Sequence, residues 1–382
     1  MSRFLFVAPP LTGHVNAPLA VGRVLTEHGH EVAWVGPETY LRPLVGPDIT
    51  VYPTGMRLYR PQADRGMIAI KSLWERFVVP FSRFILPATE KAVQAFQPDV
   101  MAVDQHALAG ALVAHRHGLR WASLAPQAME LTEPFARFPK VHAWLRGHLA
   151  TLTADAGLPA DDGFDPRFSP YLVLAFTGSA LTGPLSFPDH YRLVGPAMAP
   201  RRADPDFDWD WLDPARDPIV VTVGTMSEDI AADFYARTIA ALEPLRDKVQ
   251  AIVVAPPASV PDPPDHVLVV NRVPLLDLMP RLRAVVCHGG LNTACEALAH
   301  GVPLVVAPIR NDQPIIAEQV AAAGAGIRVR FARADAATLR GAIEAVLYEP
   351  GYRDAAARIA DSFAAAGGVA AAVRHLEELA AA

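Results

Sequence analysis

One segment, from Arg283 to Gln319, constrains the fold of this chain more than any other. Within it, the short apolar run Ala284 to Cys287 predicts a buried strand, which His288-Gly289-Gly290 breaks where a helix is predicted to begin. A second apolar run, Val302 to Ala307, is also followed by a loop and then by a helix that opens at Gln313-Pro314. Two successive strand-to-helix turns predict an α/β architecture with a parallel sheet.

The helix predicted after Gly290 offers a site for an anion. Its first turn leaves backbone N–H groups unpaired and carries roughly half a positive charge, so it would hold a phosphate without any lysine. Asn292 and Thr293 add neutral donors there. Glu296 follows about 5 to 6 Å further along the helix axis. Its carboxylate suits ribose hydroxyls and would repel phosphate, so we expect a ribose beside it.

Asp312 and Gln313 lie at the second strand-to-helix edge. Ligands of open α/β sheets collect outside such strand ends. An Asp-Gln pair offers acceptors and a donor that suit a sugar ring. The segment therefore predicts one nucleotide-sugar pocket, with phosphate, ribose and hexose contacts in that order.

The run His288-Gly289-Gly290-Leu291-Asn292-Thr293, with Glu296 and Asp312-Gln313, resembles the donor signature of the family 1 glycosyltransferases with the GT-B fold. It is most similar to bacterial members that decorate antibiotics, macrolides and other lipophilic natural products. The resemblance implies two doubly wound Rossmann-like domains that face a cleft. It also implies inverting transfer of a sugar from a UDP- or dTDP-sugar to a hydroxyl of a small hydrophobic acceptor.

Each of these donor residues also has a simpler interpretation when it is taken alone. Asp312 before Gln313-Pro314 is a plausible helix N-cap. Glu296 is a plausible solvated helix residue, and His288 a plausible core histidine. Their combination at this spacing favours the binding site.

The length of 382 residues suggests two or three domains, and two is the simpler choice. We predict an N-terminal acceptor-binding domain over residues 1–203 and a Pro- and Asp-rich linker over residues 204–217. A C-terminal nucleotide-sugar domain is predicted over residues 218–365. The resemblance implies that a final helix, residues 366–382, packs back toward the first domain.

The first predicted turn carries the candidate base. Phe4 to Ala8 predicts a strand, and the turn after it lacks G-x-G-x-x-G, which weighs against a dehydrogenase. Asn16 to His28 predicts a helix, so His14 is expected just before it. In the family that this turn resembles, a Gly-His supplies the catalytic base, and His14 is the matching residue. A loop histidine without a task is the alternative.

Asp104 ends the predicted strand Val100 to Asp104 in the same half. The resemblance implies that it orients His14 and stabilises its protonated form, as an aspartate does in a Ser-His-Asp triad. The alternative is that Asp104 caps the next helix.

Two further donor contacts follow from the resemblance. Thr225, after Gly224, matches a residue that contacts the distal phosphate. Val273 lies where plant relatives hold the base with Trp-x-Pro-Gln, but here the run is Arg272-Val273-Pro274-Leu275. The Trp and the Gln are missing, so the choice between uracil and thymine stays open.

Aromatic residues suggest where a hydrophobic acceptor binds. The helical region predicted from Met67 to Phe96, with breaks near Pro80 and Pro87, holds more aromatic residues than one packing stripe needs. Most are expected in the core, and a minority to line an apolar cavity. The candidates in this region are Trp74, Phe77 and Phe81. The resemblance implies that residues 125–163 also recognise the acceptor, which adds Met129 and Phe135.

Composition limits the remaining possibilities. The net charge of −6 and the absence of a long Lys/Arg cluster argue against nucleic acid. No long apolar stretch runs without charge or Pro, and the start leads directly into a strand, so we expect neither membrane insertion nor a secretory signal.

Cys287 and Cys295 fit buried thiols in a reducing cytoplasm. We expect no cofactor and no metal, since helix ends and neutral donors replace the cation. A monomer and a homodimer are both open.

Two other functions share the donor pocket. One is a GT-B-fold epimerase or hydrolase that acts on the sugar nucleotide itself. The other is a non-catalytic sugar-nucleotide-binding auxiliary protein. His14 and Asp104 discriminate between a catalyst and an auxiliary protein, because the latter needs neither.

Overall fold

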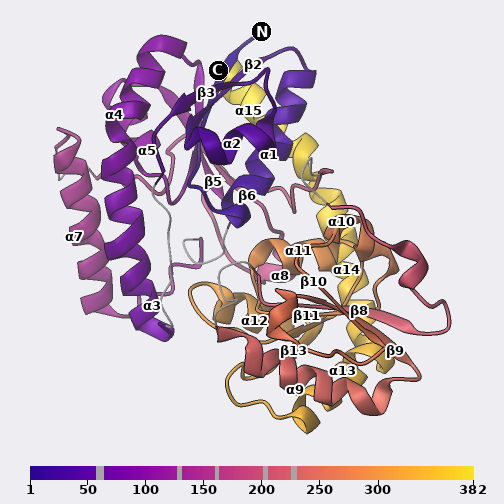
Figure 1. Cartoon of the computed structure of the whole chain (residues 1–382). Helices are drawn as coiled ribbons and strands as arrows, with labels where there is room; N and C mark the ends of the chain where they lie inside the picture. The colour runs from indigo at the N-terminus through magenta and orange to yellow at the C-terminus, as the bar shows by residue number, and fades with distance from the viewer. Residues whose placement is uncertain (57–63, 127–130, 160–162, 201–204, 225–229) are drawn as a thin grey trace.

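The structure, a computed structural model, describes residues 1–56, 64–126, 131–159, 163–200, 205–224 and 230–382 (Figure 1). It contains a seven-stranded sheet in the order β3-β2-β1-β4-β5-β6-β7 and a six-stranded sheet in the order β10-β9-β8-β11-β12-β13. Every strand pair is parallel. The predicted fold class, two doubly wound α/β domains, is confirmed.

The first sheet comprises β1 Arg3–Val7, β2 Glu31–Gly36, β3 Thr50–Pro53, β4 Val100–Asp104, β5 Arg120–Ala125, β6 Leu172–Ala175 and β7 Tyr191–Leu193. Its helices are α1 Thr12–Glu27, α2 Glu38–Val45, α3 Gly66–Leu73, the π-helical turn η1 Trp74–Val78, α4 Val79–Phe96, α5 Ala109–Arg116, α7 Pro139–Asp155 and α8 Ser179–Thr182.

The second sheet comprises β8 Asp217–Thr222, β9 Val249–Val254, β10 Val267–Val270, β11 Ala284–Cys287, β12 Leu304–Val306 and β13 Gly326–Arg328. The α-helices that follow β8 along the chain are α9 Ala232–Leu242, α10 Leu275–Leu278, α11 Leu291–Ala299, α12 Gln313–Ala322, α13 Ala336–Tyr348, α14 Pro350–Ala366 and α15 Gly368–Ala381. Short 3₁₀ turns are η2 Trp209–Trp211, η4 Glu243–Leu245, η5 Pro257–Ser259 and η6 Met279–Arg281.

The strand order places a crevice at the carboxyl end of each sheet. β1 lies between β2 and β4, and β8 lies between β9 and β11, so the connections leave in opposite directions on the two sides of β1 and of β8. Such a reversal opens space for a ligand above the strand ends. Phe4, Leu5, Phe6 and Val7 are fully buried, as residues of a parallel strand covered by helices on both faces should be.

Helix α1 begins earlier than the sequence predicts. It starts at Thr12 rather than near Asn16, because the Leu11 carbonyl accepts the N–H groups of His14 at 2.9 Å and Val15 at 3.1 Å. His14 therefore lies in the first helical turn and not in the loop before it. A helical turn fixes the direction of its side chain more firmly than a loop would.

The long helical region of the first half is continuous from α3 to α4. Pro87 lies inside α4 without ending it, so the predicted break there is wrong. The chain instead widens into the π-helical turn η1 just before Pro80, which stands in the first turn of α4. A wider turn accommodates a proline, which has no N–H and whose ring crowds the preceding turn.

The chain ends in two helices that connect the halves. By length and composition, Pro350–Ala381 would pass for one membrane-crossing helix. The structure divides it at Gly367, which adopts a left-handed conformation with φ of 88°. Ile359 and Phe363 of α14 pack in the core of the second half, and Leu376 of α15 packs against the first sheet's domain. In Figure 1 the yellow α15 lies beside α1, which it contacts. We interpret both helices as packing elements of a folded core.

The described part of the predicted linker packs on the second half. Phe207, Trp209 and Leu212 lie against that core, and the Arg281 guanidinium carbon lies 4.4 Å from the centre of the Trp209 ring.

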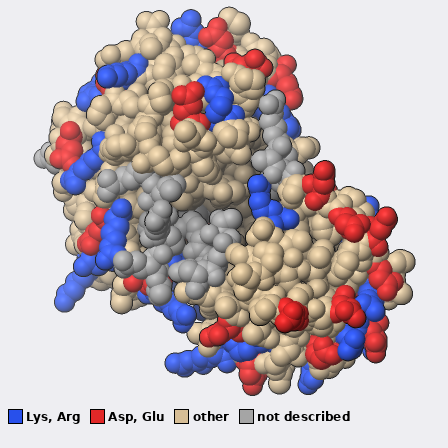
Figure 2. All heavy atoms as spheres, in the orientation of Figure 1, with Lys and Arg blue, Asp and Glu red and all other residues tan. Residues whose placement is uncertain are grey.

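Charged groups spread over the surface: on the face in Figure 2, Lys/Arg and Asp/Glu are interspersed on both lobes. This differs from the basic stripe of a nucleic-acid-binding surface.

A close helix–sheet contact beneath the crevice can be tested at Gly110 of α5. A Cβ there would lie 2.8 Å from both methyl carbons of Val103 and 3.1 Å from the Cβ of Val7. We expect Gly110→Ala to lower the free energy of unfolding in urea by about 1 to 3 kcal/mol, despite the better helix propensity of Ala.

The matched control is Gly147→Ala in α7, where a new Cβ would meet nothing within 4 Å. This variant should keep its stability or gain up to about 1 kcal/mol. Equal stability of the two variants would contradict tight packing of α5 on β1 and β4.

Candidate functional site

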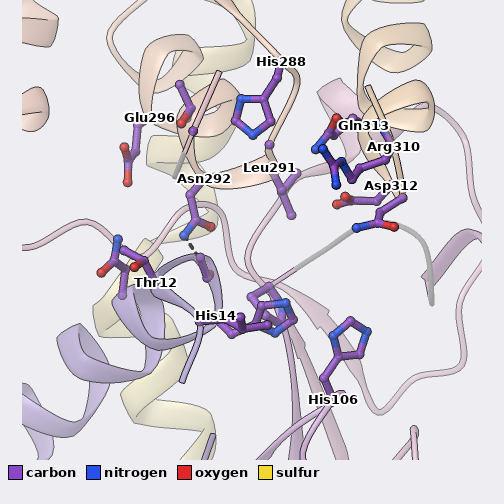
Figure 3. A pocket seen from close by; sticks show the side chains of 18 of the residues that line it. Thr12, His14, His106, His288, Leu291, Asn292, Glu296, Arg310, Asp312 and Gln313 are labelled. Atoms are coloured by element: carbon purple, nitrogen blue, oxygen red, sulfur yellow. Dashed lines mark hydrogen bonds between the residues drawn. The ribbon is translucent and has the colours of Figure 1, made fainter. Parts of the chain in front are cut away.

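A cavity of about 260 Å³ lies between the two halves (Figure 3). The first half contributes the start of α1, with Leu73, His106 and Pro126. The second half contributes the start of α11 and the loop that precedes α12. The cavity thus joins the carboxyl-end crevices of both sheets, where parallel α/β sheets bind ligands.

His14 and Asp104 form a buried pair at this cavity. The His14 Nδ1 lies 3.0 Å from one carboxylate oxygen of Asp104 and 2.9 Å from the other. The pairing of β1 with β4 brings them together, because Asp104 ends β4 and His14 lies in the first turn of α1, the helix that follows β1. Asp104 is fully buried, and its Oδ1 also accepts the backbone N–H of His106 at 2.8 Å. A proton on Nδ1 leaves Nε2 as the acceptor.

The environment favours the protonated form of His14. Burial alone would lower its pKa, but the charge of Asp104 and the hydrogen bond to it outweigh that effect, and the charge of Asp312 adds to theirs. The pKa of His14 is therefore raised above its usual 6.5. A raised pKa makes the imidazole a stronger base near neutral pH.

His106 is a cavity residue that the sequence interpretation missed. Its ring stacks on that of His14, with centroids 4.7 Å apart and planes 27° apart. It is 1% exposed, and burial together with the charge of His14 holds its pKa well below the usual value. The only signal in the sequence was its place two residues after a strand end.

His288 forms part of the opposite wall. Its ring lies between two glycines: a Cβ at Gly224 would come within 2.7 Å of Cε1, and a Cβ at Gly290 within 2.8 Å of Nε2. Burial lowers the pKa of His288 to about 4; a hydrogen bond with the Thr222 backbone opposes this effect, and the charge of Arg310 adds to it. The imidazole is therefore neutral at pH 7. The core alternative is partly right, since the ring is buried and also lines the cavity.

Helix α11 presents its N-terminus to the cavity. Gly290 is the N-cap residue and no side chain caps the helix there, while Thr293 lines the cavity. Glu296 also lines it and is only 5% exposed, which excludes the interpretation as a solvated helix residue. Asn292 donates from Nδ2 to the Gly13 carbonyl across the cavity at 2.9 Å. Its amide thus bridges the two halves in this conformation.

Asp312 and Gln313 take different positions. Asp312 lies at the N-cap of α12 without a side-chain capping bond, and its charge reaches His14 across the cavity. The Gln313 Oε1 accepts the backbone N–H groups of Ile309 and Arg310, both at 2.9 Å. This oxygen holds the loop and leaves the amide nitrogen as the polar group of Gln313 that could serve a ligand.

Of the remaining predicted residues, none of those that the structure describes lines the cavity. Val273 is 8% exposed within a hydrophobic core. Thr225 and Met129 lie outside the described residues. The acceptor assignment is wrong for four aromatic residues, whose side chains are buried in the core of the first half. Three of them belong to the helical region from α3 to α4, of whose described residues Leu73 alone lines the cavity. These four are Trp74, Phe77, Phe81 and Phe135.

Arg310 is the second cavity residue that the sequence interpretation missed. It lies in the loop between β12 and α12 and is 1% exposed. Nothing in its local sequence distinguishes it from a solvated loop arginine. Within the described ranges, no group of three or more His, Cys, Asp or Glu residues is arranged to hold a metal ion.

Known proteins share this architecture. Residues 243–379 match the family model of the erythromycin biosynthesis protein CIII-like C-terminal domain. The chain is similar to 4'-demethylrebeccamycin synthase of Lentzea aerocolonigenes, with 28% identity over 99% of each chain.

Two solved structures extend the comparison. The spinosyn rhamnosyltransferase SpnG complexed with thymidine diphosphate aligns with a TM-score of 0.79 and 26% identity, over 98% of this chain and all of SpnG. The glycosyltransferase of kitacinnamycin aligns with a TM-score of 0.82 at 22% identity, over 99% of each chain, which shows the shared fold.

The His14–Asp104 pair predicts a measurable titration. Asp104→Asn removes the charge that opposes the effect of burial, so the pKa of His14 should fall, as followed by NMR of its ring protons. Because the folded-state pKa is raised, the pair stabilises the fold fully below pH about 6.5 and loses this effect as the pH rises through the folded-state pKa.

A surface carboxylate provides the control for this titration. Glu90 contacts His117 and does not line the cavity, so Glu90→Gln should leave the titration of His14 unchanged. An unchanged or higher pKa of His14 in Asp104→Asn would show that the aspartate does not control its proton.

Proposed function

The chain belongs to the family 1 glycosyltransferases with the GT-B fold, of the type that transfers sugars to natural products, and from this premise we propose its reaction. The donor is a UDP- or dTDP-sugar bound mainly by the second half. The acceptor is a hydroxyl of a small lipophilic molecule bound mainly by the first half. We propose a cytoplasmic reaction, which suits the two free buried cysteines.

The observation that carries this proposal is the position of the His14–Asp104 pair opposite the N-terminus of α11. His14 takes the proton of the acceptor hydroxyl on Nε2 while the hydroxyl oxygen attacks the anomeric carbon. The bond from that carbon to the diphosphate oxygen breaks, and its electron pair leaves with the diphosphate. Attack from the face opposite the leaving group inverts the anomeric centre.

Several cavity residues have a part in this scheme. Asp104 holds the His14 ring and stabilises its protonated form. The start of α11, with neutral His288 and Thr293, stabilises the departing diphosphate. Glu296 binds ribose, and Asp312 with the Gln313 amide orients the sugar. Thr225 and the Val273 backbone stay predicted contacts of the distal phosphate and the base.

A screen tests the reaction. The protein is incubated with UDP-glucose and dTDP-glucose, with and without a panel of phenolic acceptors, and products are identified by mass. We expect an acceptor-dependent product whose mass rises by one sugar. Free sugar or an epimer without acceptor would identify a hydrolase or epimerase, and binding without turnover an auxiliary protein. The relatives favour neither alternative.

The role of His14 predicts a selective loss in His14→Ala. General-base removal should lower kcat with an alcohol acceptor by about a hundred- to ten-thousandfold. The affinity for UDP or dTDP should stay unchanged, because the donor contacts lie in the second half. Wild-type turnover in this variant would remove His14 from the mechanism.

Metal independence gives a further test. Turnover should survive EDTA, because a helix N-terminus and side-chain donors face the diphosphate in this scheme. Loss of activity in EDTA that magnesium or manganese restores would contradict it. Removal of EDTA by dialysis serves as the control for nonspecific inactivation.

A further inference from the structure

Arg310 is the only lysine or arginine among the described residues that line the cavity. It is 1% exposed, and arginine is rarely buried so completely. A guanidinium stays protonated in a protein, so burial keeps a permanent positive charge at this wall. Figure 3 places Arg310 beside Asp312 and Gln313, on the same side of the cavity as His288.

Gln313 holds Arg310 through both backbone groups of that residue. The Arg310 N–H donates to the Gln313 Oε1 at 2.9 Å, and the Arg310 carbonyl accepts the Gln313 N–H at 3.2 Å. The preceding Ile309 donates to the same Oε1 and is itself buried in the core of the second half. A side chain on so constrained a backbone is preorganised for its ligand.

A positive charge at this wall would offset the carboxylates that line the cavity. Glu296 and Asp312 both line it and would repel a diphosphate. His288 offers no charge at neutral pH, because its pKa is about 4. The N-terminus of α11 supplies a partial charge that falls off within the first turn. Arg310 acts on the ring of His288 through its charge, so it lies close to the wall where the diphosphate is expected.

We propose that Arg310 binds the donor diphosphate and stabilises it as the leaving group. This inference rests on the proposed function, of which it names one charged contact. When the bond between the anomeric carbon and the diphosphate oxygen breaks, the electron pair stays on that oxygen, and the guanidinium N–H groups donate to the resulting negative charge. A planar guanidinium suits two phosphate oxygens at once. Arg310 then does for this chain what a divalent cation does in metal-dependent sugar transfer.

Calorimetric titration tests the contact. UDP and dTDP are titrated into wild type and Arg310→Gln, with uridine and thymidine as ligands that lack phosphate. We expect Arg310→Gln to lower the affinity for whichever of UDP and dTDP the wild type binds more tightly. The loss should be about ten- to a hundredfold, the usual effect of losing a charge-assisted hydrogen bond. Binding of the nucleoside should not change. If Arg310→Gln does not fold, Arg310→Met is titrated instead and should show the same loss of affinity for the diphosphate.

Arg167→Gln is the matched control. Arg167 is also a buried arginine, 4% exposed, but it pairs with Asp165 in the other half and does not line the cavity. This variant should lose thermal stability and keep the wild-type affinity for diphosphate.

The outcomes separate the two proposals. If wild type binds neither UDP nor dTDP, the proposed function fails. If wild type binds one of them and Arg310→Gln binds it equally well, only the role of Arg310 is overturned. A loss confined to UDP-glucuronate, with UDP binding intact, would also overturn it, since Arg310 would then recognise a sugar carboxylate.

Discussion

The functional side chains of this protein depend on one constraint, the common direction of the strands in each sheet. Parallel strands end at the same edge, so residues distant in sequence meet there without long loops. His14 follows β1 and Asp104 ends β4, and the register of these two neighbours places the imidazole within hydrogen-bond distance of the carboxylate. In the second sheet, β11 and β12 are paired, and the turn after each reaches the same cavity. Two edges that face each other then complete one site.

The halves are connected beside that site as well as at the chain terminus. The Asn292 amide donates to the Gly13 carbonyl, and Gly13 directly precedes His14. The first turn of α11, which is expected to hold the diphosphate, is thereby coupled to the turn that carries the base. Helices α14 and α15 add a second connection, since they pack on opposite halves of the molecule. A relative movement of the halves would change both contacts, so the alignment of donor and base is sensitive to domain closure.

The sequence predicted those parts of the site that have local signatures. The glycine-rich turn at His288 follows an unmistakable strand, and Asp312 precedes a helix that opens with proline, so both could be placed before the structure was known. His106 and Arg310 could not, because their burial comes from neighbours distant in the chain. The error on Trp74, Phe77 and Phe81 has a related cause: aromatic content does not reveal which helix face meets the sheet. The start of α1 was also misplaced, since the backbone hydrogen bonds to Leu11 leave no mark in residue type.

Three imidazoles share the cavity, and their surroundings separate their proton affinities. Burial lowers the pKa of His106 and of His288, and each has a positive neighbour that lowers it further. His14 is also buried, but it alone of the three has an ionised carboxylate as its direct partner, and its pKa is raised. Near neutral pH the cavity therefore contains one imidazole that readily gains a proton and two that stay neutral. A group that must accept a proton during reaction benefits from this separation, because its neutral neighbours neither compete for the proton nor repel the charge that forms.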